Sequence, residues 1–414
     1  MAGNNFLNTQ WVSMKVLRLL LNKLVVAEYF NRSWEKDFEK EFAPGSQVTV
    51  KFPQRFTVSD GMGYQPQGIN RLQTAVNLNQ WLQVAFEWDD YEQAVKLERS
   101  EEELEDQYFE PAAAALAQEC DSRCAKWAYQ NASMTVGALG VDPTTVQTYY
   151  QARQRLEENA AGVLGKRAML ISSSMMTSLG TNITNIFHPA DEIDQMWKEG
   201  TIGKLGGATF YESQSLYSHT AGTWAASVVV YGSNQSGTSL VITATAGDTF
   251  NVGDKFSILN VNTVNPMTRR VPGHATNKVF TITQALTAAG GVGADTINFL
   301  PPIYGPGSQY QNVDALPVGG VALTLWPGTT APNGKVGTVG LNLTRDAFAF
   351  VGSKLYSPKA VEESGSAQDP DTGLSVRKVK AWDPVRSVQV NRMDSLFGLG
   401  NLYQDNGAVA VAGA

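Results

Sequence analysis

The sequence predicts an α+β fold that is interrupted by a separate all-β module. Three observations lead to this prediction. Apolar residues recur at helical spacing in several segments of the first half, and apolar and polar residues alternate in long runs elsewhere. Residues 226–334, by contrast, contain only four basic and four acidic side chains and are dominated by Val, Thr and Gly. With 414 residues, of which 43% are hydrophobic, the chain is long enough for two or three domains.

The first expected element is an amphipathic helix over about Trp11–Phe38, where apolar residues recur every three or four positions. Lys15, Arg18 and Lys23 interrupt each apolar run before it reaches the length that spans a membrane. We therefore expect this helix to pack on protein, and we predict no membrane partner.

A long two-stranded hairpin is expected next. Apolar and polar residues alternate over Gln47–Val58 and Asn70–Trp88, and a Gly-rich polar turn separates the two runs. A hairpin of this kind cannot bury both of its faces, and alone it is marginally stable in water. We therefore expect it to pack on another element, such as a neighbouring chain.

An acidic stretch follows the hairpin. Between Asp89 and Glu110 there are ten acidic residues against Lys96 and Arg99, a net charge of about −8, whereas the whole chain carries −7. The remainder therefore sums to about +1, and the composition excludes a generally basic nucleic-acid-binding protein.

The acidic stretch leads into a predicted helix with one apolar or small face. Pro111 is expected either to kink this helix or to mark the first turn of its second half. Cys120 and Cys124 are spaced four apart, a poor geometry for a disulfide, so we expect them to be small core residues. The residues that form this face are Leu104, Tyr108, Ala112, Leu116, Cys120, Cys124 and Ala128.

Three shorter elements are predicted before the all-β module. They are a helix over Thr144–Asn159, a short buried strand over 166–173 and a helix over 174–182. Within the module, four strands are predicted over 239–246, 254–261, 277–286 and 295–305, with Gly-Asp turns at 247–248 and 253–254. Mixed and alternating patterns resume after residue 334, as expected when one domain is inserted into another.

Four segments of the chain, in their order, resemble the major coat proteins of tailed double-stranded DNA bacteriophages. The resemblance is strongest to the lambdoid short-tailed phages, whose coat protein has a Hong Kong ninety-seven type capsid fold with an inserted β domain. The stretch Glu199-Gly200-Thr201-Ile202-Gly203 lies within the second segment. The four segments are DDYEQAVKLERSEEELEDQYFEPAAAALAQECDSRCAKWAY, DEIDQMWKEGTIGKLGGATFYESQSLY, GDTFNVGDKFSI and RKVKAWDPVRSVQVNRMDSLFGLGNLYQDNGAVAV.

The resemblance implies a division of the chain into the parts of that fold. These are an N-terminal arm (1–45), an E-loop hairpin (46–90), a peripheral domain with a long spine helix (91–143), an axial domain (144–225 and 335–360), an all-β insertion domain (226–334) and closing strands of the peripheral domain (361–414).

The same resemblance implies a function and its partners. The chain would be a major capsid protein, assembled in the cytoplasm of the host bacterium into pentamers and hexamers of a virion shell. A scaffolding protein, a portal protein and non-specific contact with packaged DNA would accompany it, without any cofactor. The candidate residues of the interfaces between subunits are Lys51, Arg55, Met62, Tyr64, Gln65, Glu101, Glu102, Glu105 and Asp106.

Catalytic and metal-binding patterns are weak throughout. His188, His219 and His274 lie in three different segments, and none has a partner at the spacing of a metal site or a catalytic triad. We predict no catalytic, cofactor-binding or metal-binding residue.

Two other functions remain open from the sequence. An encapsulin-type nanocompartment shell would share the fold, but the large β insertion argues against it. A carbohydrate-active enzyme with an appended β module would need two carboxylates about 5 to 10 Å apart in a pocket.

Overall fold

The structure of the chain is a computed structural model. It describes residues 14, 17, 24–32, 47–51, 56, 58, 61–64, 66–69, 73–89, 108–161, 167–183, 203–225, 227–273, 276–325, 333–345, 347–358, 361, 363–368, 374–402 and 407–414. The chain divides into two compact units. Unit 1 comprises Met1–Val50, Thr74–Cys124 and Phe348–Gly400, and unit 2 comprises Lys51–Gln73, Ala125–Ala347 and Asn401–Ala414.

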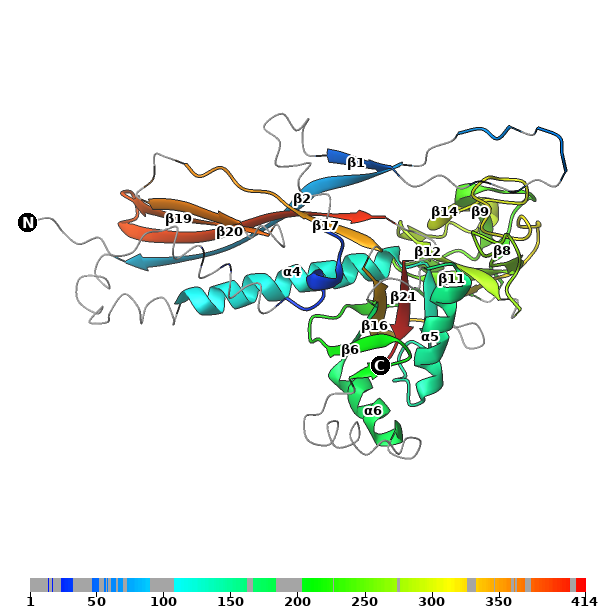
Figure 1. Ribbon diagram of the computed structural model, residues 1–414, viewed down its shortest axis with the longest axis horizontal. Coiled ribbons are helices and arrows are strands. Elements are labelled where there is room, and N and C mark those ends of the chain that lie inside the picture. Colours follow the sequence, from blue (N-terminus) through cyan, green and yellow to red (C-terminus); the bar gives the residue numbers. More distant parts are fainter. Residues whose placement is uncertain are drawn as a thin grey trace, which may run out of the picture. The chain divides into compact units, whose positions relative to one another are not determined.

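Unit 1 is built on a six-stranded sheet with the start of a long helix, α4 (Glu110–Asn131), along one face (Figure 1). Aromatic rings join the two: Phe86 lies with its ring centroid 5.3 Å from that of Phe109, just before the helix. The strand order is β1 (Gln47–Lys51), β2 (Gln73–Asp89), β20 (Val388–Asn401), β19 (Ser375–Asp383) and β18 (Glu363–Gln368), and β17 (Phe348–Gly352) also pairs with β20.

The predicted hairpin is present in part, because β1 and β2 are neighbours in this sheet. The hairpin was expected to pack on another element, such as a neighbouring chain, and its second strand does so within this chain. β2 pairs antiparallel with β20, from Asn77 opposite Leu399 to Asp89 opposite Val388. The polar and apolar alternation of β2 therefore reflects one face toward α4 and one face away from it.

Helix α4 confirms the predicted apolar face. Pro111 is the second residue of α4, directly after the π-helical residues 108 and 109, and proline is tolerated in the first turn of an α-helix. Tyr108 is exposed and Leu104 lies outside the described residues, but the other members of the face are buried, and Cys120 and Cys124 are free thiols in the core.

Replacement of Leu116 by alanine should lower the free energy of unfolding by about 2 to 5 kcal/mol, because it leaves a cavity at a side chain that is only 2% exposed. Urea unfolding followed by circular dichroism measures the change. Glu119→Ala, at an exposed position of the same helix, is the matched control and should change stability by about 0.5 kcal/mol or less. An equal midpoint for the two variants would contradict the buried position of Leu116.

The predicted N-terminal helix does not continue to Phe38, and this expectation is corrected. Met14 and Leu17 are helical, but the described residues 24–32 form only one 3-10 turn, η1 (Ala27–Tyr29). Asn31 is then extended: its N–H donates to the carbonyl of Phe348, 2.8 Å away, and its carbonyl accepts from the N–H of Phe350. Backbone pairing with β17 therefore holds Asn31 in an extended conformation.

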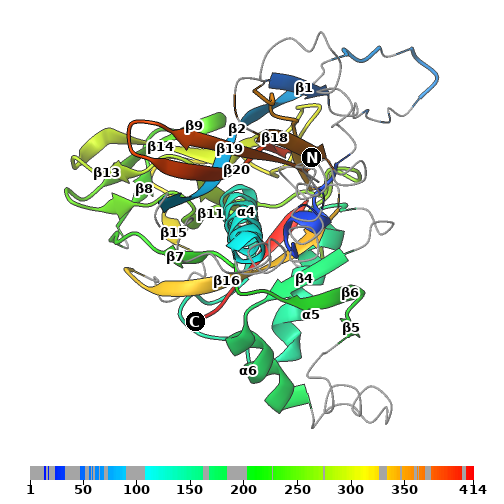
Figure 2. The same ribbon diagram turned by 90° about the vertical axis from the view of Figure 1, so that its left-hand side faces the viewer.

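Unit 2 contains a seven-stranded sheet with two helices, α5 (Val146–Glu158) and α6 (Ser173–Ile183), packed into one hydrophobic cluster with it (Figure 2). These helices and the buried strand β4 confirm the three predicted elements. The strand order is β3 (Met134–Gly137), β21 (Ala408–Ala412), β16 (Val336–Thr344), β4 (Arg167–Ile171), β6 (Ala208–Glu212) and β5 (Lys204–Leu205), and β7 (Ser218–Thr220) also pairs with β16.

Strand β21 differs from the expected grouping of 361–414. It lies between β3 and β16, antiparallel to β16 and parallel to β3, and all five of its residues are buried. An entirely apolar strand of this kind suits the centre of a sheet that is covered on both faces. The C-terminal strand β21 therefore belongs to unit 2, whereas the strands of residues 363–400 belong to unit 1.

The predicted all-β module forms the 229–325 barrel, also within unit 2. Its strands form an antiparallel sheet whose ends meet, because the N–H of Val230 donates to Val321 and the N–H of Leu323 donates to Val228. Figure 1 shows β8, β9, β11, β12 and β14 close together. The order is β15 (Leu323–Leu325), β11 (Lys255–Asn262), β12 (Asn277–Ile282), β14 (Gly291–Ile303), β9 (Gly237–Ala244) and β8 (Val229–Val230), and β10 (Thr249–Phe250) pairs with β13 (Leu286–Thr287).

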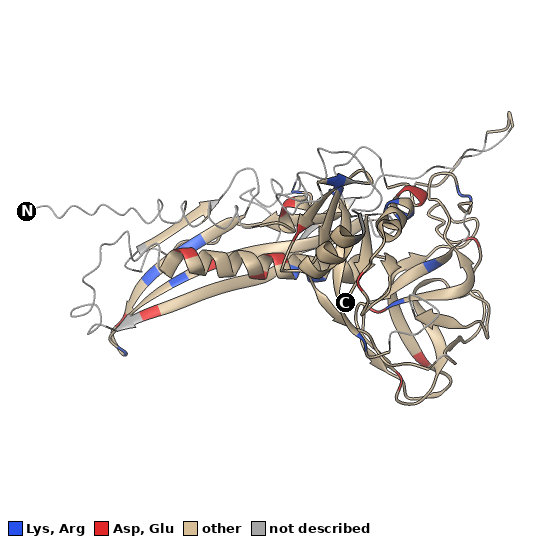
Figure 3. Cartoon of the chain, turned by 90° about the horizontal axis from the view of Figure 1, so that it is seen from below, with Lys and Arg blue, Asp and Glu red and all other residues tan. Residues whose placement is uncertain are grey.

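The barrel has its own core and buries most of its few charges. Phe256, Phe280 and Phe299 pack with ring centroids 5.1 to 5.7 Å apart at its centre. Figure 3 shows that the barrel is mostly free of charged side chains. The buried charged residues of the segment are Asp248, Asp254, Lys255, Lys278 and Asp295.

Candidate assembly surfaces

The connection between β1 and β2 exposes large apolar side chains. Met62 and Tyr64 have relative exposures of 107% and 91%. Gly61, with φ +110°, bends the chain beside them, a backbone conformation that favours glycine. Together with Phe56, Val58 and Ile69, which are also exposed, these residues form what we call the 56–69 tip. Several large apolar side chains gathered on one exposed segment indicate a binding surface.

The other predicted interface residues are placed only in part. Lys51 is the last residue of β1. Arg55 and Gln65 lie outside the described residues, and so do Glu101, Glu102, Glu105 and Asp106. The predicted interface of the acidic stretch therefore stays a prediction.

A buried carboxylate ties together three strands on the face of the unit 1 sheet that points away from α4. Asp394 is fully buried, and its oxygens accept hydrogen bonds from Arg377 (Nη2, 2.5 Å), Arg392 (Nε, 2.7 Å) and Trp81 (Nε1, 3.2 Å). Two guanidinium groups against one carboxylate leave a net positive charge beside the half-exposed indole of Trp81. This face combines an aromatic ring with arginine, two residue types that are enriched in protein interfaces.

A second buried carboxylate holds the segment that follows the N-terminal residues. Asp121 of α4 accepts hydrogen bonds from the backbone N–H groups of Val25 (2.7 Å), Val26 (3.2 Å) and Ala27 (3.0 Å). Burial raises the pKa of the Asp121 carboxyl group, although the three amides and Arg32 act in the opposite direction. Successive N–H groups that converge on an anion form a nest, and here the anion is a side chain of the same unit. We call this arrangement the Asp121 clamp.

Neither carboxylate cluster was predicted from the sequence. Trp81 and Asp394 are separated by 313 positions, and Val25 and Asp121 by 96. The available signals were small: Asp394 interrupts an alternating strand, and Asp121 follows the buried Cys120 on the apolar side of a helix.

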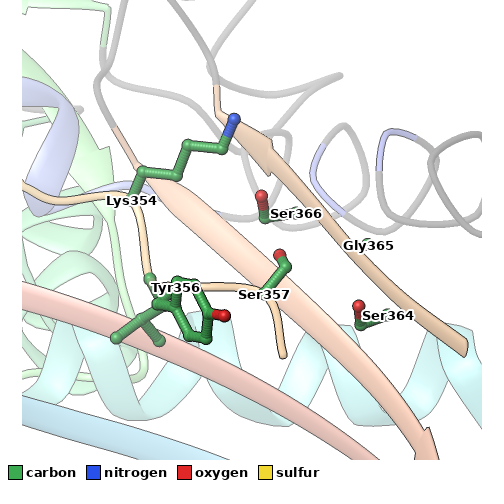
Figure 4. Close-up of a pocket in the computed structure, with 7 residues that line it drawn as sticks. Lys354, Tyr356, Ser357, Ser364, Gly365 and Ser366 are labelled. Atoms are coloured by element: carbon green, nitrogen blue, oxygen red, sulfur yellow. The ribbon is translucent and has the colours of Figure 1, made fainter. Parts of the chain in front are cut away.

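An open pocket of about 520 Å³ lies beside the edge strand β18 (Figure 4). Its polar groups are hydroxyls and one ammonium group, and the Ser364 hydroxyl donates to the carbonyl of Pro358 at 2.7 Å. The lining contains no carboxylate, so this pocket lacks the acid pair that a glycosidase would need. The lining residues are Lys354, Leu355, Tyr356, Ser357, Ser364, Gly365 and Ser366.

One histidine has a carboxylate partner that sequence spacing did not reveal. His219 Nε2 lies 2.8 Å from Asp254 Oδ1, and both residues are buried. Asp254 also accepts backbone N–H groups from Gly222 and Asn251, which is the pattern of a structural carboxylate. His188 and His274 lie outside the described residues.

The described part of the chain contains neither a cluster of metal-binding side chains nor a helix that could span a membrane. No group of three or more His, Cys, Asp or Glu side chains there could hold a metal ion. No helix in the same ranges has both the length and the apolarity to span a membrane.

The exposed apolar side chains of the 56–69 tip and the half-exposed Trp81 beside two arginines are features of surfaces that bind other proteins. The family described as "P22 coat protein - gene protein 5" matches residues 1–399. The chain therefore belongs to the P22 coat protein family. It is a major capsid protein, a structural subunit of which many copies form the virion shell.

Several solved phage structures are similar to the chain at low identity. One from Mycobacterium phage Che8 is 15% identical, with 100% of each chain covered and a TM-score of 0.49. The capsid of the cyanophage P-SCSP1u is 12% identical over 90% of this chain and 84% of that one, with a TM-score of 0.42. The capsid of Ralstonia phage GP4 is 7% identical over 94% and 87%, with a TM-score of 0.44. No curated protein matches the chain.

Proposed function

We propose that this coat protein is a non-enzymatic subunit of the lambdoid short-tailed phage type, with the tailed-phage capsid fold, and that it assembles as pentamers and hexamers. In this proposal the strands of residues 363–400 and the first part of α4 form the peripheral domain. The seven-stranded sheet, with β21 included, forms the axial domain, and the 229–325 barrel is the insertion domain. The pairing of β7 with β16, which flank the barrel in sequence, supports its insertion into the axial sheet.

The 56–69 tip carries the proposal for assembly. Met62 and Tyr64 are almost completely exposed. When a neighbouring subunit covers their apolar area, the free energy of burial stabilises the contact. Gly61, Gly63 and Gly68 surround them in the connection between β1 and β2. The tip is therefore the E-loop tip of the proposed fold, and its partner is a second copy of the chain.

Further partners belong to the same proposal. A scaffolding protein and a portal protein accompany assembly in the cytoplasm of the host bacterium, and packaged DNA touches the shell without sequence specificity. The encapsulin alternative is disfavoured by the match of residues 1–399 to a phage coat protein family.

A photocrosslinking experiment tests the proposed contact directly. With Tyr64 replaced by p-benzoylphenylalanine, ultraviolet irradiation of assembled shells should give covalent dimers and larger species of the chain on a denaturing gel. The same label at Tyr231, a half-exposed aromatic residue of the barrel, serves as a positional control whose crosslinked peptides should differ. Only intramolecular products from position 64 in intact shells would refute the contact.

A further inference from the structure

A single turn of the barrel, Gly253-Asp254-Lys255 between β10 and β11, makes a dense set of contacts with unit 2 segments outside the barrel. We call it the 253–255 turn. Gly253 has φ +98°, and a Cβ atom there would lie 2.9 Å from the ring of Tyr129, near the end of α4. Only glycine allows the turn to approach that ring so closely.

Asp254 fixes the turn to the strand that leads into the barrel. Its carboxylate accepts the N–H of Gly222 at 3.1 Å and meets His219 Nε2 at 2.8 Å. It also accepts the N–H of Asn251, within its own turn, at 2.8 Å. The Asp254 carboxylate therefore contacts its own turn, through Asn251, and the segment that precedes the barrel, through His219 and Gly222.

Lys255 reaches from the barrel to the end of α4. Its buried ammonium group donates to the carbonyls of Tyr129 (2.7 Å) and Ala132 and to the Thr281 hydroxyl (2.8 Å), and it lies 4.5 Å from the centre of the Tyr129 ring. The Thr281 hydroxyl in turn donates to the carbonyl of Ala132 at 2.8 Å. Three N–H donors thus meet three acceptors, which satisfies the ammonium group completely.

Helix α4 needs such a partner. The last carbonyls of a helix have no intrahelical donor, and a cation at this end is favourable. α4 carries no basic residue in its own last turn. The ammonium group comes instead from Lys255, which lies more than 120 positions further along the chain.

We propose that the 253–255 turn is a lock, in which Lys255 supplies the C-terminal cap of α4 and completes its last turn only when the barrel is docked. The lock is a property of the single subunit and does not depend on the proposed shell contacts. The last turn of α4 thereby becomes a reporter of barrel docking.

Hydrogen–deuterium exchange of the full-length, unassembled subunit tests this lock. Lys255→Met keeps the length of the aliphatic chain and removes the ammonium group. We expect amides of residues 129–132 to exchange at least about tenfold faster in this variant, while those of β9 and β14 keep their protection. Lys335→Met, which removes an exposed lysine of the same unit, should change neither.

Thr281→Val provides a second variant in case Lys255→Met does not fold. It removes one acceptor of the ammonium group and one donor to Ala132, so exchange at 129–132 should rise by a smaller factor. Unchanged exchange at these amides in the folded variants would overturn the proposal. Equal loss of protection in β9, β14 and residues 129–132 would also overturn it, because Lys255 would then support the barrel core rather than cap the helix.

Discussion

Shells should fail to form when Met62 and Tyr64 are both replaced by aspartate, although the subunit itself should fold as before. The two side chains are exposed in the single chain, so their replacement removes no internal contact. Covering a large apolar side chain contributes about 1.5 to 3 kcal/mol, and an unpaired carboxylate in the same interface is strongly unfavourable. Because about 1.4 kcal/mol is a factor of ten, the concentration needed for assembly should rise by at least about a hundredfold.

Sedimentation and thermal unfolding separate the two parts of this prediction. The double variant should sediment as free subunits or small oligomers and keep its melting temperature. The conservative pair Met62→Leu and Tyr64→Phe keeps the apolar area and should still form shells. Normal shells from the aspartate variant would show that the 56–69 tip lies outside the contacts that drive assembly.

Asp121→Ala should destabilise the subunit by about 3 to 5 kcal/mol. The substitution leaves the N–H groups of residues 25–27 buried without an acceptor, and an unsatisfied buried donor costs more than the bond itself contributes. Residues 24–32 should then become accessible to protease. Asp121→Asn, which keeps one carbonyl oxygen, should lose less.

Urea unfolding and limited proteolysis measure both consequences, with Glu119→Ala as the control on the same helix. Digestion and stability like those of the control would contradict the Asp121 clamp.

The raised pKa of the Asp121 carboxyl group also predicts how stability changes with pH. Because burial raises the pKa of Asp121 in the folded state, its contribution to stability falls as pH rises from about 3.9 through the folded pKa, and acid does not release the clamp through this group.

Local patterns predicted the separate elements well. The i+4 face of α4 with Leu116 at its centre, the buried strand β4 and the strands of the barrel all follow from periodicity and turn residues, which act over a few positions. The sequence also predicted a polar, Gly-rich turn between two alternating strands, and Gly61, with φ +110°, lies in the connection between β1 and β2.

Local patterns do not specify which distant segments pair with one another. Nothing in the alternation of β2 specifies β20, three hundred positions later, as its neighbour. The run of residues 408–412 is apolar on both faces, and such a short run carries no signal that assigns it to one sheet rather than another.

The candidate surfaces show the same division. Met62 and Tyr64 of the 56–69 tip were candidates that the resemblance implies, and their place in an interface stays a prediction. The Asp394 cluster and the Asp121 clamp depend on long-range contacts. The Gly-Asp turns of the barrel were predicted as turns. The role of Gly253 and Asp254 as contacts with Tyr129 and His219 could not be predicted, because those partners lie on other elements.

Electron microscopy of the purified full-length chain, produced alone and fractionated by sedimentation, tests the central claim that this protein is a shell-forming subunit. We expect rapidly sedimenting particles that appear as closed or irregular shells with curved, regularly arranged walls. Free subunits and small oligomers alone, at every concentration and also in the presence of a co-expressed scaffolding protein, would contradict it.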